Sequence, residues 1–140
     1  FFLVITSLLF SSCKKDDEET IFRINLIDTF PVEIIEFQEN IYVRLSYQHP
    51  EGYIGFSDPD YLSLEVKDSR LLQADYYHVI PITPPNNNLS VTGELLVEID
   101  SPFLFGNGNT ELVNFSIRIQ DQNLSWSNTI TTPNISVNRE

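Results

Sequence analysis

The sequence predicts an all-β fold, a single antiparallel β-sandwich of about seven strands. Three observations lead to this prediction. Apolar and polar residues alternate with a period of two in five separate runs, as they do in strands that bury one face. Turn-forming residues gather between runs, at 49–60, 83–88 and 101–110, which is typical of short strands joined by loops. No stretch of adequate length has apolar residues at helical spacing.

The first three strands follow directly from the alternation. The first, 21–28, has apolar residues at its even positions from Phe22 to Leu26. The second, 40–48, has them at its odd positions, and the third, 61–67, at its even positions from Leu62 onwards. Because successive side chains of a strand point to opposite faces, each run presents one apolar face to a core.

The later strands include two irregular ones. The fourth, 74–82, is aromatic and β-branched, and Pro81 predicts that it lies at the edge or end of a sheet. The fifth, 93–100, and the sixth, 113–120, alternate cleanly. The seventh, 127–137, changes phase around its proline, and a bulge on a terminal edge strand would explain the change.

Short strands in this number and spacing are typical of an immunoglobulin-like sandwich, the fold class that we predict for the chain. Residues 31–37 are a candidate for a short extra strand. An antibody domain is excluded, because the chain has one cysteine, Cys13, and its only tryptophan, Trp126, lies late in the sequence.

The first twelve residues form an uncharged apolar stretch that ends in two serines, immediately before Cys13. The stretch is too short to span a bilayer, which takes about 20 apolar residues, and it matches the apolar region of a signal peptide. The missing initiator Met and basic leading region predict that the sequence is truncated at its start. The alternatives are a membrane anchor whose start is lost and a secreted protein with an unpaired thiol.

The residues around Cys13 resemble a bacterial lipoprotein signal, in which the cysteine is acylated and becomes the mature N-terminus. Phe10 stands where that pattern has an aliphatic residue. The charged run after the cysteine resembles the export tag of surface lipoproteins from Bacteroidota-type bacteria, and it consists of Lys14, Lys15, Asp16, Asp17, Glu18 and Glu19. The resemblance implies a lipid anchor in the outer membrane and exposure at the cell surface.

This interpretation divides the chain into three parts. Residues 1–12 are the lipoprotein signal peptide, residues 13–20 are the lipidated cysteine with a charged tether, and residues 21–140 are the immunoglobulin-like domain. Two short segments, 51–60 and 119–128, also resemble immunoglobulin-like domains of the same lipoproteins. In such relatives the first loop often reads Asp-Gly-Asp-Ile-Gly, and Tyr53 replaces the second acid. The likeness supports the fold and implies no particular activity.

The composition narrows the range of partners. The formal net charge is −12 at pH 7, so phosphate backbones would be repelled and we expect no nucleic-acid partner. Anionic headgroups would be repelled too, so membrane contact has to come from the lipid. The charge suits a soluble body, a cation site or a basic partner.

One end of the predicted sandwich collects the candidate binding residues, because alternate loops of this fold meet there. The aromatic and amide residues expected on a partner or ligand face are Tyr53, Phe56, Tyr61, Asn87 and Trp126. Oxygen ligands for a possible Ca²⁺ ion would be Glu51, Asp58, Asp60 and Asp121. The alternatives are aromatic residues that cap the core and solvated acids that favour tight turns.

The opposite end holds the Gly/Asn-rich loop 103–109, which either plugs the sandwich or docks on an outer-membrane partner. His49 and His78 lie in different elements without a signature nucleophile nearby, and zinc spacings and phosphate loops are absent from the sequence. We therefore expect a non-enzymatic surface lipoprotein that acts as a binding or accessory module for a protein partner, such as an outer-membrane protein complex, and needs no cofactor apart from the possible calcium. A glycan-binding module and a small envelope hydrolase are the alternatives.

Overall fold

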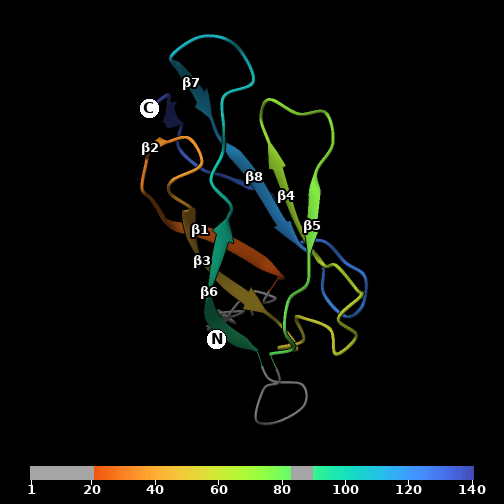
Figure 1. Ribbon diagram of the computed structural model, residues 1–140. Coiled ribbons are helices and arrows are strands. Elements are labelled where there is room, and N and C mark those ends of the chain that lie inside the picture. The colour runs from red at the N-terminus through yellow and green to blue at the C-terminus, as the bar shows by residue number, and fades with distance from the viewer. Residues whose placement is uncertain (1–20, 83–89) are drawn as a thin grey trace, which may run out of the picture.

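The computed structural model describes residues 21–82 and 90–140, and it confirms an all-β fold for them (Figure 1). These two ranges form ten strands and no helix, so they contain no helix of the length and hydropathy that a bilayer span requires. Cys13, the charged run 14–19 and Asn87 lie outside the described residues.

One three-stranded antiparallel sheet has the order β1-β3-β6. Its strands are β1 (Arg23–Phe30), β3 (Ile41–His49) and β6 (Val91–Ile99). The central strand β3 buries every second side chain, as its strict alternation predicts. The pairing of β1 with β3 is interrupted by a register shift between Leu26 and Asp28.

The other strands form a four-stranded and a three-stranded sheet. The first has the order β5-β4-β8-β9, with β5 (Asp75–Tyr77), β4 (Leu64–Asp68), β8 (Phe115–Ile119) and β9 (Ile130–Thr131). The second has the order β2-β10-β7, with β2 (Glu33–Ile35), β10 (Ile135–Asn138) and β7 (Thr110–Val113). In it, β10 pairs antiparallel with β7 and parallel with β2.

The count of ten rather than seven has local causes. Asn114 alone separates β7 from β8, and the segment 132–134, which contains Pro133, separates β9 from β10. A proline cannot donate to a sheet ladder, so the pairing breaks where the sequence changes phase. The extra strand expected within 31–37 is β2.

Three boundaries differ from the prediction. The strand expected at 74–82 is ordered as a strand only over β5, and beyond it Val79 and Ile82 form isolated backbone hydrogen bonds with the segment 54–56. The strand expected at 61–67 begins at Leu64, which leaves Leu62 exposed instead of in the core. Strand β7 begins at Thr110, three residues before the strand predicted at 113–120, because Leu112 faces solvent and hides the alternation.

A single hydrophobic core joins the three sheets. Val43, Val66, Ile117 and Val137 contribute to it from β3, β4, β8 and β10, and each is almost fully buried. The described chain starts beside the end of β3, since Arg23 pairs with Gln48. The turn after β4 and the loop before β7 lie at the other end of the molecule (Figure 1).

Candidate functional site

The predicted aromatic face is packed rather than open. The Phe56 and Tyr61 rings lie 3.9 Å apart between centroids, and the Tyr61 hydroxyl donates to Oε1 of Gln120 at 2.8 Å. Trp126 lies under the Arg118 guanidinium, whose carbon is 4.2 Å from the ring centroid. All three aromatic residues, and Tyr53 as well, are half-buried, so this end offers little free ring surface.

The four carboxylates predicted for calcium do not converge. Asp121 is buried and accepts the backbone N–H groups of Asn123 and Ser125, each at 2.9 Å. Asp58 accepts the N–H of Asp60 within its own turn at 3.0 Å. Across 21–82 and 90–140, no group of three or more His, Cys, Asp or Glu side chains is placed to hold a metal ion.

Asp121 is instead paired with His49 in the interior. Nε2 of His49 lies 3.0 Å from Oδ2 of Asp121, and the two side chains are only 1% and 6% exposed. Nδ1 of His49 accepts the backbone N–H groups of Glu51 at 3.0 Å and Tyr53 at 3.3 Å. The ring proton therefore sits on Nε2, facing Asp121. Both ring nitrogens are engaged, which leaves neither available to activate a nucleophile.

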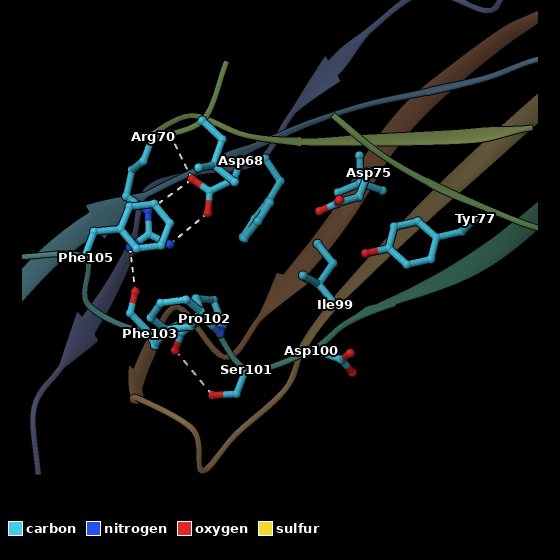
Figure 2. Close-up of a pocket in the computed structure, with 13 residues that line it drawn as sticks. Asp68, Arg70, Asp75, Tyr77, Ile99, Asp100, Ser101, Pro102, Phe103 and Phe105 are labelled. Carbon is cyan, nitrogen blue, oxygen red and sulfur yellow. Dashed lines mark hydrogen bonds and ion pairs between the residues drawn. The ribbon is translucent and has the colours of Figure 1, made fainter. Parts of the chain in front are cut away.

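A cavity of about 420 Å³ opens at the opposite end, between β4 and β5 on one side and the segment after β6 on the other. Its floor is formed by Val66, Ile99 and Phe115, all nearly buried. Figure 2 shows Arg70, Phe103 and Phe105 along one side, facing Asp75 and Tyr77 across the opening. We call this cavity the aromatic pocket, and its lining also includes Asp100.

The loop that carries the pocket's phenylalanines is held by hydrogen bonds to its backbone. Leu104 is buried beneath it, so the neighbouring Phe103 and Phe105 remain 45% and 46% exposed. Glu36 accepts the N–H of Leu104 at 3.0 Å. Oε1 of Glu111 accepts the N–H groups of Phe105 and Gly106 at 3.0 and 2.7 Å. The loop is thus fixed before any ligand arrives.

Arg70 ties this loop to the turn after β4. Its Nε and Nη2 donate to the two carboxylate oxygens of Asp68 at 3.1 and 2.8 Å. Its Nη1 donates to the Phe103 carbonyl and to Glu111, both at 2.8 Å. The guanidinium carbon also lies 3.9 Å from the centre of the Phe105 ring. One side chain therefore sets the position of both phenylalanines.

Phe37 extends the aromatic surface beyond the pocket. Its ring stacks on Phe103 at 5.3 Å between centroids with an interplanar angle of 10°, and the residue is 71% exposed. Its backbone φ is +63°, in the left-handed region that bulky residues rarely adopt. A strained backbone that displays a large apolar side chain to solvent is a pattern typical of binding sites.

The far side of the pocket is acidic. Burial, with Asp75 and Asp100 nearby, raises the pKa of the Tyr77 hydroxyl above its ordinary value. Burial is the largest of these causes, and the carboxylates add to it because they disfavour a second negative charge. In contrast to Asp68, neither aspartate side chain has a hydrogen bond or ion pair within the described residues.

Sequence reasoning identified the loop 103–109 but not the rest of the pocket. Leu104 plugs the core, as one interpretation of that loop expects, while Phe103 and Phe105 face outwards, and docking of the loop on a partner stays a prediction. Arg70, Tyr77 and Phe37 come from other segments and were not predicted. The one available signal was the Asp68-Ser69-Arg70 triplet, whose acid and base can pair across a tight turn.

The lowered pKa of Glu111 predicts how the loop 103–109 responds to acid. The N–H groups of Gly106 and Phe105 and then the Arg70 guanidinium lower its pKa below the ordinary 4.5. A lowered carboxyl pKa contributes stability that is present above 4.5 and lost as the pH falls through the folded value. We expect the Phe105 and Gly106 amide resonances to titrate together with a midpoint below 4.5, and Glu111→Gln to abolish that titration. A midpoint at or above 4.5 would contradict the prediction.

The chain matches no protein-family model, and neither a curated protein nor a solved structure matches it significantly.

Proposed function

We propose that this chain is a lipid-anchored lipoprotein of the outer membrane, exposed at the cell surface, whose immunoglobulin-like sandwich binds a protein partner and catalyses no reaction. The strand order supports the sandwich. Sheet β1-β3-β6 would be one layer, and β5, β4, β8 and β9 would be the other, continued by β7 and β10. The parallel pairing of β2 with β10 would complete the second layer at its edge.

The aromatic pocket is the surface where we propose that the protein partner binds. Phe37, Phe103 and Phe105 form a contiguous and exposed aromatic surface. Aromatic residues dominate the energetically important centres of protein interfaces. Their backbone is already held by Glu36 and Glu111, so little ordering entropy would be lost on binding.

The position of the pocket suits a tethered protein. Phe22 contacts the His49 ring at 4.8 Å between centroids, so the chain enters the domain at the end away from the pocket. With a lipid on Cys13, the segment 14–20 would extend at most about 25 Å. The end of the domain that holds Trp126 would then face the membrane, and the aromatic pocket would point outwards, roughly 30 Å further along β3.

Capture from outer membranes tests the proposal. The full lipidated chain is purified in mild detergent as wild type, as Phe103→Ser/Phe105→Ser and as the control Leu124→Ser. Leu124 is also exposed but lies at the other end. We expect one stoichiometric protein with wild type and control, and at least about thirtyfold weaker binding with the double variant, since each of the two lost anchors costs about 1 kcal/mol or more. Equal recovery with all three proteins would refute the proposal.

A glycan-binding module is the second candidate, favoured by the outer face of Phe37. An exposed ring on a fixed loop can stack on a sugar as well as on a side chain. Recovery of polysaccharide in place of a protein, with the same dependence on Phe103 and Phe105, would decide for this alternative.

A further inference from the structure

The aromatic pocket combines an apolar floor with an acidic rim. Val66, Ile99 and Phe115 form the floor. Asp75 and Asp100 stand at the rim and are exposed. A ligand that fits this pocket needs an apolar segment to cover the floor and a polar or charged group at its end to reach the rim.

The positive charge in the pocket is already balanced. Arg70 forms ion pairs with Asp68 and Glu111, both at 2.8 Å, so it does not neutralise the rim. The negative charges of Asp75 and Asp100 therefore lack an ion-pair partner among the described residues. Arg70 also lies over the Phe105 ring, which shows that a guanidinium fits against the rings of this wall.

We propose that the aromatic pocket receives a lysine or arginine side chain of the protein partner, with its methylene stem on the floor and its cationic group between Asp75 and Asp100. This inference rests on the proposed function and names the chemistry of the partner at the same site. Lysine and arginine side chains carry an apolar stem and a charged head, which is the order of surfaces found here. The net charge of −12 attracts a basic segment at longer range.

Other ligands match the pocket less well. An anionic group would be repelled by the two rim carboxylates. A neutral apolar side chain would cover the floor but would desolvate the aspartates without giving them a partner. An amino sugar carries the same ammonium group but lacks the methylene stem that would cover the floor.

A peptide titration tests the inference. The full chain, isotope-labelled and held in non-ionic detergent, is titrated with short peptides that differ only in a central lysine, arginine, norleucine or glutamate. We expect the lysine and arginine peptides to shift the amide resonances of Tyr77, Asp100 and Phe103. Norleucine, which has the stem without the charge, should bind about tenfold more weakly, and the glutamate peptide should not bind.

Charge-removing variants link this preference to the rim. Asp75→Asn/Asp100→Asn should lower lysine affinity to the norleucine value, whereas the control Asp60→Asn/Glu94→Gln, which removes two exposed charges elsewhere, should keep most of the preference. Equal affinity for lysine and norleucine, or a preference that survives in Asp75→Asn/Asp100→Asn, would overturn the inference. So would binding of a glucosamine oligomer without binding of either basic peptide.

The peptide titration and the membrane capture distinguish failure of this inference from failure of the proposed function. If the peptides show no preference for a cation but capture of the membrane partner still depends on Phe103 and Phe105, this inference is wrong and the proposed function stands. If capture is also independent of the two phenylalanines, both are wrong.

Discussion

Replacing His49 with leucine should lower the free energy of unfolding by about 3–5 kcal/mol, because one buried carboxylate and two backbone N–H groups would each lose a hydrogen-bond partner, at about 1–3 kcal/mol apiece. Asp121 would be left buried without the ring N–H that now lies 3.0 Å away. The N–H groups of Glu51 and Tyr53 would also lose their acceptor, Nδ1. Urea unfolding of the full chain in detergent measures the change.

His78 provides the matched control for this substitution. It is half-buried and, within 21–82 and 90–140, makes one side-chain hydrogen bond, at 2.7 Å to the Phe56 carbonyl, so His78→Leu should cost about 0.5–1.5 kcal/mol. The double variant His49→Leu/Asp121→Leu should recover part of the loss, because no unpaired charge is then buried. A His49→Leu variant no less stable than His78→Leu would show that the buried pair contributes little.

Replacing Arg70 with methionine should cost about 2–3 kcal/mol and reduce partner capture by about tenfold. The stability estimate is below the range for a fully buried pair, because the side chains of Arg70, Asp68 and Glu111 are 14%, 11% and 23% exposed and water screens them in part. The loss of capture follows because Arg70 holds the Phe103 carbonyl and covers the Phe105 ring. Unfolding curves and the membrane capture described above give the two values.

The variant Arg70→Lys distinguishes the effect of the positive charge at position 70 from the effect of the planar shape of the guanidinium. Lysine keeps the positive charge but lacks the planar group that donates to both oxygens of Asp68 while reaching Glu111. We expect intermediate stability and intermediate capture. If lysine performs as well as arginine in both measurements, Arg70 acts through its charge alone, and the orientation of Phe103 and Phe105 does not depend on the planar guanidinium.

Alternation was sufficient to predict the strands that cross the centre of the molecule. In β3 and β8 every inward position is nearly fully buried and, apart from His49 at the end of β3, apolar, so period and burial agree. Prediction was poorer at the margins. In β7, Leu112 points to solvent, and a short edge strand has too few inward residues to show a period.

The aromatic pocket was harder to predict for a different reason. In the run Phe103-Leu104-Phe105, hydrophobicity does not say which residue is buried. Leu104 is buried because Glu36, distant in sequence, accepts its N–H group, and Glu111, six residues beyond Phe105, accepts that of Phe105. Tyr77 and Phe37 likewise reach the site through tertiary contacts, and a single sequence carries no local trace of such contacts.

The place of β10 between β2 and β7 has a consequence for biosynthesis. Glu33, near the start of the described chain, pairs with Ser136, close to its end. During translation β2 would stay without its neighbour until Ile135–Asn138 had been made. Contacts of such long range close slowly. The described residues should therefore acquire their final shape only after β10 has been synthesised, and a ribosome that stops before Ile135 would release a product in which two strands lack their neighbour.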